Sequence, residues 1–272
     1  MVKFKGVEKL KHQRLFVFSA FSLISVVIIR TIQLMFLTDN KTGFFITGLE
    51  GIGTALTVLA VLLIALSGLM IFLGKKEKID PVPTPSYLVG GTAILAGVAH
   101  IIEPLLGTEG LISVPQILLT LRLLLLPIAG AVFIYFGLSI ILEKNPHFGL
   151  SVFLVLCLVI RLMTSFIGLT GMSNISENMF DVLMLVSTLI FILFFSKAIC
   201  GLSRSTGYRR LIAVGVTAVL FTAASSLPTI IVSVIMGVNL SHTPIDSPIT
   251  GIFTALFIAC YLINICRKNK PV

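Results

Sequence analysis

Long apolar runs separated by short polar segments form the main pattern along this chain of 272 residues. A helix needs about 20 mostly apolar residues to cross the hydrocarbon core of a bilayer, which is about 30 Å thick. The runs are continuous rather than alternating, which favours helices over the strands of a transmembrane barrel. The pattern therefore predicts an all-α integral membrane protein with eight transmembrane helices. Their expected positions are Leu15–Leu37, Ile46–Leu73, Tyr87–Leu106, Leu118–Leu142, Phe148–Leu169, Met179–Cys200, Leu211–Met236 and Pro248–Cys266.

Short motifs recur in the same order in the two halves of the chain, which indicates an internal repeat. We expect two repeats of four helices, at residues 1–145 and 146–272. Four spans return the chain to its starting side, so both repeats enter the membrane from the same face. A pseudo-twofold axis along the membrane normal should then relate them, as in carriers built from parallel repeats. The matching motifs are LISVVIIR at 23–30 with LVLCLVIR at 154–161, GGTAIL at 90–95 with GVTAVL at 215–220, and PIAG at 127–130 with PITG at 248–251.

Composition supports a membrane protein and argues against a soluble domain. Apolar residues make up 57% of the chain and charged residues 11%, and the mean hydropathy is +1.10. A soluble domain of this length needs far more polar surface. The four cysteines form no CxxC pair, so we expect neither a disulfide framework nor a metal site, and no cofactor.

Basic residues are concentrated on one side of the predicted membrane topology. The positive-inside rule then predicts that both termini are cytoplasmic, in the cell (plasma) membrane. The net charge of +9 matches anionic lipid headgroups on that face better than it matches nucleic acid, since the basic residues are spread over several loops and tails. The opposite loops hold Lys41 alone. The cytoplasmic set is Lys3, Lys5, Lys9, Lys11, Arg14, Lys75, Lys76, Lys78, Lys144, Lys197, Arg204, Arg209, Arg210, Arg267, Lys268 and Lys270.

Two arginines inside the spans are each followed by a carboxylate twenty residues later: Arg30 by Glu50, and Arg161 by Asp181. Charged side chains at bilayer depth are costly and usually face protein or water. Because consecutive spans form a hairpin, each pair is expected to meet near its outer end. We expect structural ion pairs that lock the two hairpins, and Arg30 and Glu50 are also candidates for solute binding.

A third polar group, His100, Glu103 and Arg122, belongs to the first repeat only. His100 and Glu103 are three residues apart and so share one helix face. Arg122 is expected at a similar depth on the next span. Arginine suits carboxylate or phosphate, while histidine can change its charge between about pH 5 and 8. These residues are the predicted solute site.

The sequence thus predicts a multi-pass membrane protein that binds, and transports, a small anionic or zwitterionic solute through an outward-facing polar site. An alternative is a membrane sensor or an accessory subunit with a membrane-protein partner. We expect no enzymatic activity. An intramembrane hydrolase would need His100 to contact Ser225 or Ser226, and the chain has no GxSxG motif to support it.

Overall fold

The computed structural model describes residues 3–39, 44–73, 85–106, 115–144, 147–170, 175–199, 208–237 and 248–268. Within these ranges the chain is almost entirely helical, and eight helices are long and apolar enough to cross a membrane. This confirms the prediction of an all-α chain with eight apolar helices. The helices are α1 (Lys3–Ile32), α2 (Glu50–Leu73), α3 (Tyr87–Ile102), α4 (Gln116–Ile141), α5 (Phe148–Thr170), α6 (Ile175–Ile199), α7 (Tyr208–Met236) and α8 (Pro248–Lys268).

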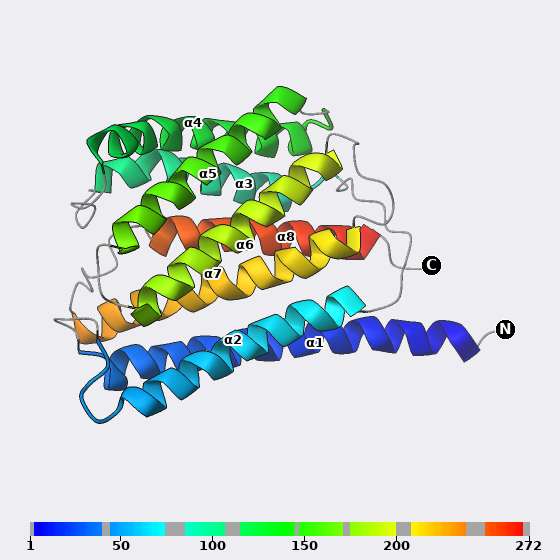
Figure 1. Cartoon of the computed structure of the whole chain (residues 1–272). Helices are drawn as coiled ribbons and strands as arrows, with labels where there is room; N and C mark the ends of the chain where they lie inside the picture. Colours follow the sequence, from blue (N-terminus) through cyan, green and yellow to red (C-terminus); the bar gives the residue numbers. More distant parts are fainter. Residues whose placement is uncertain are drawn as a thin grey trace.

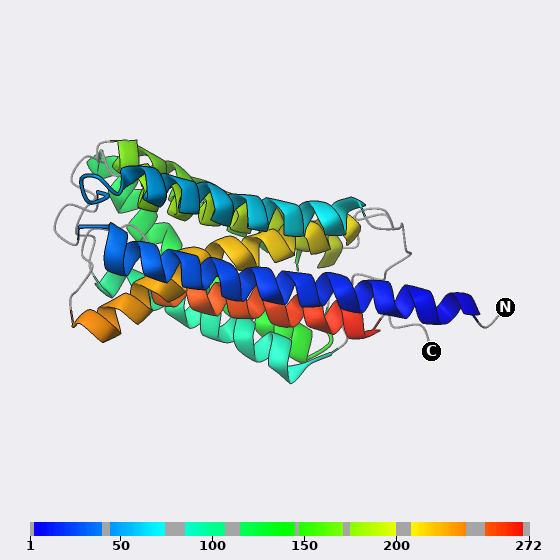
Figure 2. The same ribbon diagram turned by 90° about the horizontal axis from the view of Figure 1, so that it is seen from below.

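The eight helices form one elongated bundle in which neighbours in sequence run in opposite directions (Figure 1). Each consecutive hairpin, α1–α2, α3–α4, α5–α6 and α7–α8, is packed together. Helix α7 packs against more helices than any other in the described bundle, namely α1, α2, α6 and α8. Both termini lie at the same end of the bundle, and the beginning of α1 projects beyond the other helices there (Figure 2).

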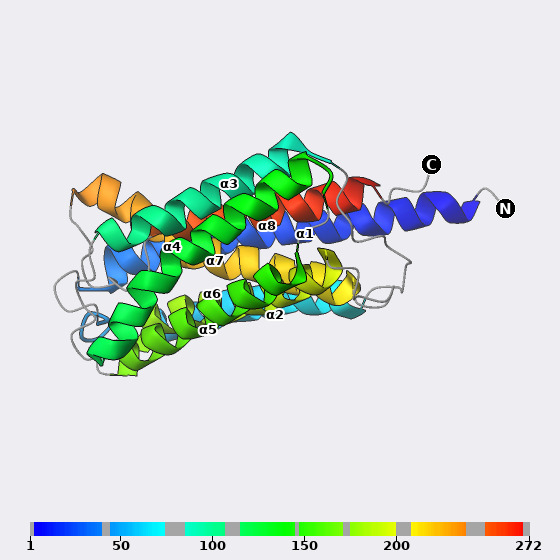
Figure 3. The ribbon, with the colours of Figure 1, turned by 90° about the horizontal axis from the view of Figure 1, so that it is seen from above.

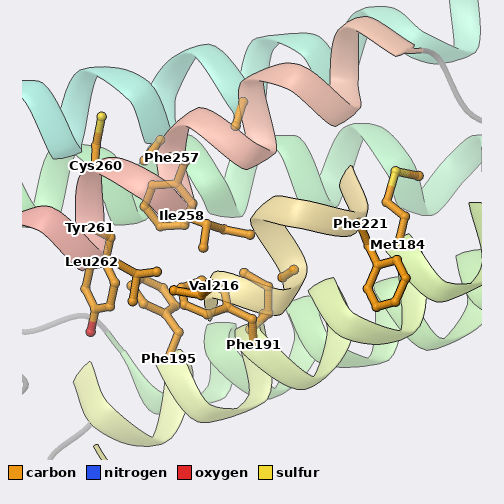
Figure 4. Packing of buried hydrophobic residues seen from close by; sticks show 14 of the residues in the cluster. Met184, Phe191, Phe195, Val216, Phe221, Phe257, Ile258, Cys260, Tyr261 and Leu262 are labelled. Atoms are coloured by element: carbon orange, nitrogen blue, oxygen red, sulfur yellow. The ribbon is translucent and has the colours of Figure 1, made fainter. Parts of the chain in front are cut away.

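Aromatic rings from α4, α6 and α8 fill the centre of the bundle. Phe195 of α6 lies edge-on to Phe257 and to Tyr261 of α8, with ring centroids 5.4 Å and 4.9 Å apart. Figure 4 shows these three rings together between the helices. Phe133 of α4 continues the chain of contacts, 5.9 Å from Phe257. Edge-to-face pairs of this kind add about 0.5–1.5 kcal/mol each beyond the burial of their area.

The first two helices begin at positions that differ from the predicted ones. α1 starts at Lys3, earlier than the apolar window, and continues into a π-helical segment at Gln33–Leu37. α2 starts at Glu50 rather than at Ile46. An antiparallel bridge between Thr38 and Phe45 and a positive φ of 92° at Gly48 hold the preceding residues in a turn. Hydropathy alone does not detect such a turn, because its residues are largely apolar.

Candidate functional site

Four buried polar residues from three helices meet at the end of the bundle opposite the termini. His100 lies in the last turn of α3, and Glu103 begins the short 3₁₀ segment Glu103–Leu106. Arg122 lies in the second turn of α4, and Arg161 in the second half of α5. The helix α4 packs against both α3 and α5, which brings the three helices side by side (Figure 3). We call these four residues the polar cluster.

The carboxylate of Glu103 is at the centre of the polar cluster. Nη2 of Arg161 donates to both of its oxygens, at 3.1 Å and 3.0 Å. Nη2 of Arg122 donates to Oε1 at 3.2 Å. The second terminal nitrogen of Arg122 donates to the hydroxyl of Ser165 at 3.4 Å. One carboxylate therefore joins arginines from two different helices.

Two contacts of the His100 ring fit a neutral imidazole that carries its proton on Nδ1. Its Nδ1 lies 2.8 Å from the carbonyl oxygen of Ala96, which can only accept, so Nδ1 carries the proton. Its Nε2 lies 3.0 Å from Nη1 of Arg161, which can only donate, so Nε2 is the acceptor. The ring also packs against Phe133, with centroids 5.1 Å apart. This contact connects the cluster to the aromatic core.

The polar cluster is removed from solvent: His100, Glu103, Arg122 and Arg161 are between 2% and 6% exposed. Charges at such depth are tolerated only where they are paired and hydrogen-bonded. Removing one partner of a buried ion pair typically costs about 3–5 kcal/mol, because the other charge is left without compensation. The lone pairs that could hold a metal, on Glu103 and His100, already accept hydrogen bonds from guanidinium groups. The arrangement suits an anion better than a cation.

The structure brings together the three predicted site residues and adds Arg161, which the sequence assigned to a hairpin pair with Asp181. The contacts of Arg161 described above cross to His100 of α3 and to Glu103 directly after it. Asp181 on α6 accepts a hydrogen bond from the hydroxyl of Ser225 on α7. The two ring nitrogens of His100 contact the carbonyl oxygen of Ala96 and Nη1 of Arg161.

The predicted Arg30–Glu50 pair is not formed. Arg30 is 3% exposed and donates to Oε1 of Gln33 at 3.0 Å. Its guanidinium also lies over the ring of Phe180, 4.2 Å from the centroid. Glu50 is exposed in the first turn of α2, and the structure shows no ion pair for it among the described residues. The turn before α2 explains the difference, because it puts Glu50 at the helix start, where a carboxylate is favourable.

Gln33 makes the connection that Glu50 was expected to make. Its side-chain nitrogen donates to the carbonyl oxygen of Gly53 at 2.8 Å and to the hydroxyl of Thr57 at 2.9 Å, both on α2. The sequence signal for this role was its position three residues after Arg30. The partner residues on α2 carry no comparable signal, since Gly and Thr are common in membrane helices.

No protein-family model matches this chain, and the searches of curated proteins and of solved structures also found no match. The chemistry of the polar cluster must therefore be inferred from its own residues. What the eight apolar helices establish is that the chain has the architecture of a multi-pass membrane protein.

Proposed function

We propose that this protein binds a small anionic or zwitterionic solute at the polar cluster and carries it across the membrane. The observation that supports the proposal is the convergence of Arg122 and Arg161 on one buried carboxylate, Glu103. Purely structural arginines in membrane helices can extend to the interface. Here, two of them point inward from separate helices to the same point, as a site that recognises a carboxylate or phosphate requires.

His100 would make solute binding depend on pH. The charged groups facing it are Arg161 from α5, together with Glu103 and Arg122 of the same cluster. A proton on Nε2 would remove the acceptor that Arg161 uses and add a positive charge. Binding of an anion should then strengthen as the pH falls through the range in which histidine titrates.

The charge distribution supports an orientation with both termini in the cytoplasm, in the plasma membrane. The polar cluster would then lie at the outer end of the bundle, where a solute from outside could reach it. The four packed hairpins are compatible with the proposed tandem 4+4 repeat, in which each repeat contributes two hairpins. The function involves binding and movement, with no bond made or broken.

An accessory or sensory role is the second candidate, and the projecting start of α1 favours it (Figure 2). A helix that extends beyond the bundle on the side with most basic loops is available to a membrane-protein partner or to anionic headgroups. Deleting residues 2–13 should leave solute binding intact and abolish partner association if this second function is correct.

The test of solute binding is a thermal-shift screen of the purified full-length protein against carboxylates, amino acids, organic phosphates and neutral polyols at pH 5.5 and 7.5. Any stabilising compound is then tested for uptake into proteoliposomes. Arg122→Lys keeps the charge but loses the planar donor, so it should weaken binding by about tenfold or more. His100→Gln keeps an acceptor for Arg161 and should remove the pH dependence.

Arg209→Gln is the control, because Arg209 lies at the other end of the bundle, where its Nε donates to the carbonyl oxygen of Ile71. It should leave the solute-induced shift unchanged. A solute-induced shift in melting temperature that is as large in Arg122→Lys as in wild type, and that keeps its pH dependence in His100→Gln, would exclude the polar cluster as the site. Absence of any stabilising compound would contradict the proposal as a whole.

A further inference from the structure

We propose that Glu103 is a resident carboxylate, which a carboxylate of the solute displaces from Arg122 and Arg161. The inference rests on the proposed function and specifies it: the solute class is a carboxylate, and binding is an exchange of one carboxylate for another. Glu103 would thus close the site when no solute is present, by occupying the position that the solute takes.

The geometry around Glu103 is that of a carboxylate-binding site. Nη2 of Arg161 bridges its two oxygens at 3.0 Å and 3.1 Å, and Nη2 of Arg122 reaches Oε1 at 3.2 Å. These donors together engage both oxygens of one carboxylate. A phosphate would bring further oxygens into a buried site in which Nη1 of Arg161 and Nη1 of Arg122 already donate to His100 and Ser165. The site therefore favours a carboxylate over a phosphate.

Both arginines have anchors that do not depend on Glu103. Nη1 of Arg161 donates to Nε2 of His100 at 3.0 Å, and His100 is itself fixed by the carbonyl oxygen of Ala96 at 2.8 Å. Nη1 of Arg122 donates to the hydroxyl of Ser165 at 3.4 Å. The donors would stay in place when Glu103 leaves, and such preorganisation lowers the cost of binding an incoming ligand.

Glu103 lies at a position from which its side chain can move away. Its backbone N–H still bonds to the carbonyl oxygen of Ala99, but the α-helix ends here and the short 3₁₀ segment begins. The next residue is Pro104, which has no N–H to continue the helical hydrogen bonds. Arg122 and Arg161 instead lie inside long helices. Of the three charged residues, the carboxylate is the one at a helix end.

The test is chemical rescue of Glu103→Ala in the full-length protein. This variant removes the resident carboxylate and leaves space for a small one, so acetate or formate should restore the thermal stability that the variant loses. Sodium chloride at equal concentration controls for ionic strength, and acetamide controls for shape without charge. The wild-type protein, in which Glu103 occupies the site, should respond far less to acetate.

Glu103→Gln is the matched variant, because it keeps the shape of the side chain and removes its charge. The amide fills the space, so acetate should stabilise it much less than it stabilises Glu103→Ala. If acetamide, chloride or inorganic phosphate stabilises Glu103→Ala as well as acetate does, the site is not a carboxylate site and the inference is wrong.

If Glu103→Ala does not fold, Glu103→Asp takes its place. Its side chain is shorter by one methylene and should compete less well, so acetate should stabilise Glu103→Asp more than wild type; an equal response would overturn the inference. If acetate stabilises the variants but no solute is transported, the exchange site is supported and the transport function is contradicted. If wild type takes up a solute but acetate does not stabilise the variants, transport is supported and the exchange site is contradicted.

Discussion

At the residue scale, Arg30 contacts Gln33 on its own helix face rather than the predicted Glu50. Gln33 accepts a hydrogen bond from Arg30 and donates two to α2, so its amide connects the charge of one helix to the backbone of the next. Gln33 is fully buried, whereas Glu50 is exposed. A buried polar group that loses its partners has a larger energetic effect than a surface charge.

Replacing Gln33 by leucine should therefore lower the free energy of unfolding by about 1–3 kcal/mol, because the guanidinium of Arg30 and the hydroxyl of Thr57 each lose a partner. Glu50→Gln should change it by less than about 0.5 kcal/mol, as is usual for surface positions. Thermal unfolding in detergent measures both. Gln116→Leu, the same substitution at an exposed position of α4, is the control. A loss in Glu50→Gln equal to that in Gln33→Leu would restore Glu50 as the partner of Arg30.

At the element scale, glycines let α3 and α4 approach until their backbones touch. A Cβ built on Gly97 would lie 2.5 Å from the carbonyl oxygen of Gly130, and one built on Gly130 would lie 2.5 Å from that of Gly97. Gly90 and Gly137 repeat this reciprocal contact seven residues away, at 2.6 Å. Small residues commonly allow such close packing between membrane helices. This hairpin carries His100, Glu103 and Arg122, so its tight packing fixes three of the four cluster residues.

Gly97→Ala should destabilise the protein by about 1–3 kcal/mol, since the added methyl group forces the two backbones apart. Gly91→Ala is a control on the same helix: a Cβ there meets nothing within 4 Å, and alanine has the higher helix propensity. It should be neutral or slightly stabilising. The measurements are thermal unfolding and the rise in melting temperature that a bound solute produces. Equal effects of the two substitutions would mean that the α3–α4 contact is looser than described.

At the scale of the whole molecule, an even number of spans puts both termini at one end of the bundle (Figure 2). The polar cluster lies at the opposite end. The distribution of Lys and Arg along the sequence predicts that the end with the termini faces the cytoplasm, because cytoplasmic loops carry the excess of positive charge.

Cysteine labelling in intact cells tests this orientation. The four native cysteines are first replaced. Single cysteines at Asn40, Thr108 or Ser241 should then react with an impermeant maleimide from outside, because they fall between the predicted outer ends of the spans. Cysteines at Lys76 or Ser205 should react only after lysis. External labelling at Lys76 would reverse the orientation and move the polar cluster to the cytoplasmic end.

The sequence by itself determined the class of the protein, the eight apolar helices and the candidate residues His100, Glu103 and Arg122. These are local properties: in a bilayer each helix satisfies its own backbone hydrogen bonds, so each span is visible as a run of apolar residues, and a charge within that run is conspicuous. The repeat inferred from the matching motifs stays a prediction.

Only the tertiary structure decided which helices are neighbours, and with that which charges meet. Arg161 lies 58 residues after Glu103, and nothing in the spacing connects them until α4 is seen to pack against both α3 and α5. The same holds for the reciprocal glycines of α3 and α4, whose pairing appears only in the structure. Helix association in membranes depends on surface fit between segments far apart in the chain, and hydropathy along one segment contains no information about that fit.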